Sequence, residues 1–317
     1  MTAALVLGIA IVIPHVLRLD RAVPSVAASI WLSALLLRAL LATLAAVSLL
    51  ALLPGSSPFN ALSGWCWNTT LPFLATHLGI SGARLGQAVT LMPLVLLVAW
   101  GGLRVAQITR SHRSTKKMLR EATLGTGPAG SLIVGGSSVI VAAAGLLRPD
   151  VILSARALTE LDDEELAAGI AHEQGHIVRR HRWWLALADV CRSVGRLIPG
   201  TRVAMEQFRF HLERDADQWA VDRSHSRLAL ASAICKVGSG TFDNLSFALD
   251  GSNAVGRVDE LIAPGESRIN ARAQKLATVT SMLLVVVAIS FASAVPTATA
   301  AGVKHLESHS SSTPCPL

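Results

Sequence analysis

The sequence predicts a mainly helical α+β protein in which four membrane-spanning helices carry one water-soluble domain between the third and the fourth span. The 317 residues are 51% hydrophobic and only 15% charged, whereas an average soluble domain is about 25% charged. The charge is also unevenly distributed, because 19 of the 21 acidic residues fall between Glu121 and Glu266. A charged middle flanked by apolar ends argues against a soluble globular enzyme and against disorder.

Four apolar runs define the predicted spans, since a helix needs about 20 apolar residues to cross a bilayer. The runs cover residues 2–17, 26–53, 88–105 and 277–295, and the first run is short and contains Pro14. They divide the chain into two spans within residues 1–54, an extracytoplasmic loop at 55–87, a third span at 88–105, a cytoplasmic domain at 106–274, a fourth span at 275–296 and an extracytoplasmic tail at 297–317.

Basic residues near the spans set the predicted orientation, because Lys and Arg accumulate on the cytoplasmic side of a membrane. With four spans, all of these residues except Arg84 and Lys304 fall on one side, and that side holds residues 106–274. A basic cluster after the third span is of the kind that attracts anionic lipid; its members are Arg110, Arg113, Lys116, Lys117 and Arg120. The net charge of +7 could also indicate nucleic acid. No aromatic residues interleave with the cluster, so a direct nucleic-acid partner is not expected.

Short strands precede helices in the predicted water-soluble domain. Gly135-Gly136-Ser137-Ser138 lies between two β-rich runs and predicts a hairpin. Asp162 followed by Glu165 predicts a capping box at the start of a helix. The expected elements are strands at 131–134, 139–143 and 151–153, a helix that begins after Asp162 and runs through His176 to as far as Val194, and helices at 202–222 and 226–237.

His172-Glu173-Gln174-Gly175-His176 is the main chemical signal in the chain. Residues four apart lie on one face of a helix, so both imidazoles can bind one metal ion. Glu173 points to the adjacent side, where it can act on a water molecule, as in the H-E-x-x-H arrangement of zinc peptidases. Gly175 is small enough to let another helix approach closely. The motif therefore predicts His172 and His176 as zinc ligands and Glu173 as the catalytic base.

A catalytic zinc ion takes three protein ligands and keeps one position for water, so a third ligand is needed. Glu213 on the next predicted helix is the expected one, and Asp217, four residues further on, lies on the same face. Asp217 can accept a hydrogen bond from a ligand imidazole and orient it. His181 is the alternative ligand, but on a continuous helix it would lie about 140° round from His176.

These motifs resemble those of the gluzincin class of membrane metallopeptidases, in which the BlaR/MecR type and the HtpX type share the pattern. The order of three spans, a cytoplasmic peptidase and a fourth span resembles the BlaR/MecR type. Two less specific segments, Gly145–Ser154 and Arg257–Leu261, resemble the sequences before its active-site helix and before its last span. Only residues 297–317 follow the fourth predicted span, so we do not expect the penicillin-binding sensor domain of that type.

The resemblance implies a zinc-dependent endopeptidase of the bacterial cell membrane that cleaves a cytoplasmic protein, with a regulatory role such as cleavage of a winged-helix repressor. Two alternatives stay open: an HtpX-like membrane quality-control protease, and a non-catalytic membrane signalling protein whose zinc site is structural. Peptide hydrolysis also needs a donor that stabilises the oxyanion. Because the chain contains no Tyr, the candidates for this donor are His211, Arg223, His225 and Arg227.

Overall fold

The computed structural model describes residues 22–52, 121–136, 138–146, 149–223, 226–238 and 251–263, together with residue 19 and scattered residues between 99 and 118. The chain divides into two compact units. The first includes helix α2 (Pro24–Leu52) up to Leu44 and the segment Cys191–His211. The second includes the segments Ala45–Val190 and Leu212–Gly265, which contain every residue of the predicted zinc site.

Helix α2 corresponds to the second predicted span, and its helical structure is confirmed. Its segment Pro24–Thr43 is long and apolar enough to cross a membrane, a property that core helices and signal sequences can share. Arg38 in this segment is buried, and it donates hydrogen bonds to the carbonyl oxygens of Ala34 at 3.1 Å and Pro199 at 3.5 Å. The first and fourth predicted spans, and most of the third, lie outside the described residues.

The second unit contains a four-stranded sheet with the order β1-β2-β4-β3. Its strands are β1 (Thr123–Thr126), β2 (Leu132–Val134), β3 (Val141–Ala144) and β4 (Asp150–Ser154). The predicted hairpin of β2 with β3 is wrong, because β4 lies between them and pairs parallel with β2 and antiparallel with β3. Strand β1, which was not predicted, forms the antiparallel pair with β2 instead. Strand β3 therefore lies at an edge of the sheet.

The predicted helices are confirmed, but the first is split into two. In the described part of the chain, the helices after the sheet are α6 (Ala157–Glu160), α7 (Asp163–Val178), α8 (His181–Val194), α9 (Thr201–Val221), α10 (Arg227–Gly238) and α11 (Gly251–Ile262). The expected continuation to Val194 is wrong because Arg180, between α7 and α8, adopts a left-handed conformation with φ of 55°. A residue in that conformation ends a helix. Helices α6 and α11 were not predicted.

Helix α7 begins at the predicted capping box. The Asp162 side chain accepts a hydrogen bond from the backbone N–H of Glu165 at 2.8 Å, and the Glu165 side chain accepts one from the N–H of Asp162 at 2.9 Å. The Glu165 carboxylate also accepts a hydrogen bond from Lys236 of α10 at 2.6 Å. These contacts fix where α7 starts and tie its first turn to α10.

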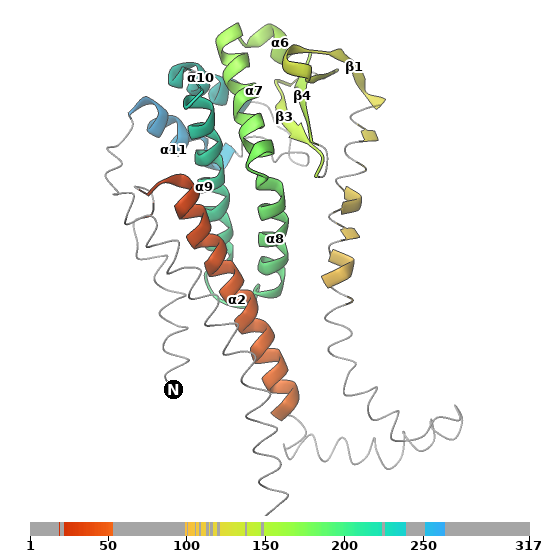
Figure 1. The fold of residues 1–317 in the computed structure, drawn as a ribbon, viewed down its shortest axis with the longest axis vertical. Helices are drawn as coiled ribbons and strands as arrows, with labels where there is room; N and C mark the ends of the chain where they lie inside the picture. The colour runs from red at the N-terminus through yellow and green to blue at the C-terminus, as the bar shows by residue number, and fades with distance from the viewer. Residues whose placement is uncertain are drawn as a thin grey trace, which may run out of the picture. The chain divides into compact units, whose positions relative to one another are not determined.

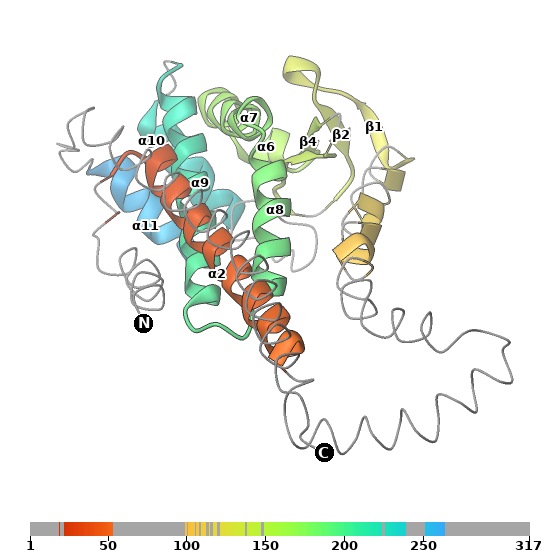
Figure 2. The ribbon, with the colours of Figure 1, turned by 60° about the horizontal axis from the view of Figure 1, so that its bottom comes forward.

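Both ribbon views show α7 between the sheet and α10 (Figures 1 and 2). Its two apolar faces take part in two separate clusters of buried side chains. The cluster on the sheet side includes Leu166 and Ile170 of α7, Val141, Leu153 and Ala233. The other includes Ala168 and Ala171 of α7, Ala220, Leu230, Ile234 and Leu261. Packing on two faces holds the central helix and the residues that it carries in a defined orientation.

Gly175 allows α7 and α9 to approach each other closely, as its small size predicts. A Cβ atom at this position would lie 2.9 Å from Cδ1 and 3.1 Å from Cβ of Trp219 on α9. The Trp219 ring is also covered by the guanidinium group of Arg223, which lies 3.1 Å from the ring centroid. The indole therefore has little room to move away from a larger residue on α7.

Gly175→Ala should destabilise the fold, although alanine is the better helix former by about 1 kcal/mol. The added methyl group overpacks the contact with Trp219, and overpacking typically costs about 1–3 kcal/mol. Gly169→Ala on the same helix is the matched control, because its Cβ would meet Val141 at an ordinary contact distance of 3.5 Å. Thermal unfolding of the metal-free variants should give a lower midpoint for Gly175→Ala only. Equal midpoints for the two variants would contradict the close packing.

Candidate metal centre

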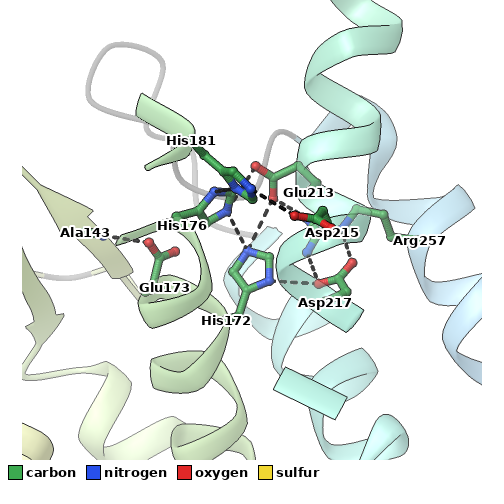
Figure 3. Close-up of polar contacts among 9 residues, drawn as sticks. All are labelled: Ala143, His172, Glu173, His176, His181, Glu213, Asp215, Asp217 and Arg257. Atoms are coloured by element: carbon green, nitrogen blue, oxygen red, sulfur yellow. Dashed lines mark hydrogen bonds and ion pairs between the residues drawn. The ribbon is translucent and has the colours of Figure 1, made fainter. Parts of the chain in front are cut away.

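Helices α7 and α9 bring the three predicted ligands together (Figure 3). The Nε2 atoms of His172 and His176 are 3.1 Å apart, and the Glu213 carboxylate lies 3.3 Å from the first and 3.4 Å from the second. The ligand atoms all lie within 4.8 Å of one another, so this group could hold a metal ion. Two imidazoles and one carboxylate are also the ligand set of one class of catalytic zinc sites. The chemistry of the donors therefore fits zinc.

The outward-facing nitrogen of His172 contacts a carboxylate. Nδ1 of His172 lies 2.8 Å from Oδ1 of Asp217, and both side chains are buried. Asp217 thus occupies the place predicted for it, next to a candidate ligand imidazole. A proton on Nδ1 facing this carboxylate leaves Nε2 with its lone pair toward the metal centre.

The outward-facing nitrogen of His176 contacts His181. The two Nδ1 atoms are 2.9 Å apart, and Nε2 of His181 lies 3.0 Å from Oδ2 of Asp215. Burial lowers the pKa of His181, and Asp215 offsets only part of this effect, so the ring is neutral at pH 7. Asp215 can only accept, so His181 carries its proton on Nε2 and accepts one from Nδ1 of His176. In neutral His176, the lone pair then lies on Nε2.

The position of His181 differs from the one expected on a continuous helix. The break at Arg180 places it at the first position of α8, where its ring meets His176 instead of lying about 140° round from it. Asp215, the partner of His181, also forms an ion pair with Arg179. His181 is not one of the three candidate ligands. Its ring contacts Nδ1 of His176, the nitrogen that does not face the metal centre, and this contact suits a role in orienting the His176 imidazole.

Glu173 is buried and turned toward the sheet. Its Oε2 accepts a hydrogen bond from the backbone N–H of Ala143 on the edge strand β3 at 2.7 Å (Figure 3). A small hollow beside Glu173 and His172 is lined otherwise by apolar side chains and Gly169; the apolar residues are Val141, Leu230, Ala233, Ile234 and Val237. Glu173 therefore lies where an edge strand, an apolar hollow and the metal centre meet.

Arg257 of α11 is a site residue that was not predicted. Its buried guanidinium group donates hydrogen bonds to Asp217 at 2.6 and 2.7 Å and to Glu213 at 2.9 Å. Only the resemblance of Arg257–Leu261 to a family segment pointed to this part of the chain. An isolated Arg beyond the ligand helices carries no spacing signal that would link it to them.

The charges in the centre determine the protonation of its residues. Burial alone would raise the pKa of Glu213 and Asp217, but their polar and charged neighbours outweigh it and lower both values. These neighbours are His176 and Arg257 for Glu213, and Arg257 and His172 for Asp217. Burial likewise lowers the pKa of His172, but Asp217 and Glu213 outweigh it and raise the value to about 9. In the metal-free protein at pH 7, His172 is therefore protonated and both carboxylates are ionised.

The structure describes three of the four candidates for the oxyanion donor. Arg223 stacks on Trp219, Arg227 is exposed, and His211 is buried beside Phe210. His225 lies outside the described residues.

One comparison with known proteins gave a match. Residues 106–194 match the model of peptidase family M48, a family of zinc-dependent metallopeptidases. The matched segment contains His172, Glu173 and His176 and ends before Glu213. No curated protein and no solved structure matches the chain. The match supports a zinc metallopeptidase of the broad family that includes the HtpX and BlaR types, without separating these types.

Zinc binding at pH 7 should release about one proton from His172, because a ligand imidazole must be neutral. With a pKa of about 9, the protonated ring stabilises the metal-free fold fully below the ordinary value of 6.5. That stabilisation is lost as the pH rises through about 9, while zinc affinity increases over the same range. Calorimetric titration with zinc in buffers of different ionisation enthalpy measures the released protons. Asp217→Asn removes the main charge that raises the pKa of His172, so zinc binding to this variant should release fewer protons. The same number of released protons in both proteins would contradict the role of Asp217 in keeping His172 protonated.

Proposed function

We propose that this chain is a zinc-dependent endopeptidase of the cell membrane whose catalytic unit faces the cytoplasm. The observation that carries the proposal is the combination of one metal-ligand group, His172, His176 and Glu213, with a buried carboxylate, Glu173, next to it in the sequence. The family match over residues 106–194 supports the same activity.

Each residue of the centre has a separate task in peptide hydrolysis. Zinc held by the three ligands would supply a Lewis acid and an activated water molecule. Glu173 would act as the general base that accepts a proton from the attacking water and returns it to the leaving amine. The N–H of Ala143 holds the Glu173 carboxylate from the side of the sheet. Asp217 and His181 orient the two imidazoles through their Nδ1 atoms.

We propose that the substrate lies along the edge strand β3, next to Glu173. An extended peptide can add to the edge of a sheet through main-chain hydrogen bonds. The hollow itself is small and mostly apolar. These features favour a protein substrate in extended conformation over a compact folded one.

A regulatory protease and a quality-control protease differ in the number of their substrates. We propose the regulatory role, with a cytoplasmic protein such as a winged-helix repressor as the substrate. Comparing new N-termini in cells that express wild type or Glu173→Gln tests this role. One or a few cleaved proteins would support regulation, and many unrelated ones would support an HtpX-like quality-control protease. A structural zinc site does not need a carboxylate at Glu173, so this residue favours an enzyme over a non-catalytic signalling protein.

Glu173→Gln should abolish cleavage and keep zinc. An amide cannot accept the proton from water, and loss of a general base typically lowers the rate about 10²- to 10⁴-fold. Glu213→Ala is the contrasting variant, because it should lose zinc as well as activity. Elemental analysis of the purified proteins and a peptidase assay measure the two properties. Activity of Glu173→Gln within a few-fold of wild type would overturn its role as base, and loss of its zinc would show a role in ligation or folding.

The predicted orientation can be tested with the cysteines of the chain. Cys235 is exposed on α10, whereas Cys191 is buried, so Cys235 is the informative residue of the catalytic unit. Cys66 lies in the predicted extracytoplasmic loop, outside the described residues. In intact cells, a membrane-impermeant thiol reagent should label a variant with only Cys66 and not one with only Cys235. Permeabilised cells are the control, in which Cys235 should react. Labelling of Cys235 in intact cells would place the catalytic unit outside.

A further inference from the structure

We propose that Arg257 of α11 is a positioning residue of the metal centre, which holds Glu213 and Asp217 of α9 in the orientation that zinc binding requires. The inference rests on the proposed function, because it concerns the same centre. It assigns a role in zinc binding to a helix that carries none of the three ligands.

The guanidinium group of Arg257 reaches two carboxylates at once (Figure 3). Nε and Nη2 donate to the two oxygens of Asp217 at 2.7 and 2.6 Å, and Nη1 donates to Oε2 of Glu213 at 2.9 Å. The Arg257 side chain is fully buried. This arrangement needs the rigid planar fork of arginine, and a lysine ammonium group cannot reproduce it.

Arg257 contacts one candidate ligand directly and a second through Asp217. Its guanidinium group holds Oε2 of Glu213, while Oε1 of Glu213 lies 3.4 Å from Nε2 of His176. Oδ1 of Asp217 contacts both Nη2 of Arg257 at 2.6 Å and Nδ1 of His172 at 2.8 Å. Arg257 therefore acts directly on one candidate ligand and, through Asp217, on a second.

Arg257 also balances the charge of the two carboxylates. Glu213 and Asp217 lie four residues apart on one helix, where like charges repel each other. In a buried site this repulsion would push the two carboxylates apart. One guanidinium group hydrogen-bonded to both offsets the repulsion and keeps them side by side.

A second arginine between the same two helices provides a matched control. Arg214 of α9 forms a two-pronged ion pair with Glu260 of α11. It neighbours Glu213 in the sequence, but its described contacts are with Glu260 and not with the metal centre. Replacing either arginine weakens the attachment of α11 to α9, and only replacing Arg257 disturbs the carboxylates of the centre.

The test compares Arg257→Lys with Arg214→Lys in the full chain purified in detergent. Zinc affinity is measured by competition with a chelator, and thermal unfolding of the metal-free proteins is measured in parallel. Both variants should unfold at a lower temperature than wild type. Arg257→Lys should bind zinc about 10- to 100-fold more weakly, the usual cost of losing a residue that supports a ligand. Arg214→Lys should stay within about threefold of wild type.

Equal zinc affinity of the two variants, whether near the wild-type value or reduced to the same extent, would overturn the inference, because Arg257 would then act only on the stability of the helix pair. If Arg257→Lys does not fold, Arg257→Ala is titrated with zinc in the presence of ethylguanidinium or ethylammonium. Restored binding with ethylguanidinium only supports the inference, and no difference overturns it. Absence of zinc binding by wild type would instead refute the proposed function.

Discussion

The candidate metal centre depends on the pairing of its buried carboxylates with side chains that can carry positive charge. Glu213 and Asp217 of α9 are ionised in the interior because the histidines of α7 and Arg257 of α11 face them. Removing one partner of a buried ion pair typically costs about 3–5 kcal/mol, because the other charge is left uncompensated. Three helices that are separate in the sequence are therefore joined by one set of ion pairs. The residues proposed to bind zinc are the same residues that hold these helices together.

Local spacing explains why much of this centre could be predicted from the sequence. His172 and His176, like Glu213 and Asp217, are four residues apart, and a helix places such pairs on one face. The capping box at Asp162 fixed the start of α7 in the same way, since its hydrogen bonds join residues three apart. Even the close contact at Gly175 followed from residue size. Apart from the contact at Gly175, which involves Trp219 of α9, each of these features depends on residues three or four positions apart.

The features that were missed depend on contacts over longer distances in the chain. Gly135 and Gly136 resemble a hairpin turn, but β4, which comes later in the sequence, takes the place beside β2. Arg257 and Asp217 are 40 positions apart in the sequence, and nothing near either residue indicates the pairing. The break after α7 was also missed, because Arg180 adopts a conformation in which glycine or asparagine is usual.

The break between α7 and α8 constrains the length of the connection between these two helices. Connections between helices generally tolerate insertions and deletions, because they lie on the surface and carry few contacts. Here Arg179 pairs with Asp215, and the ring of His181 meets both His176 and Asp215. One added residue would turn the start of α8 by about 100° and carry the imidazole away from both partners. We therefore expect the distance of five positions between His176 and His181 to be fixed by selection.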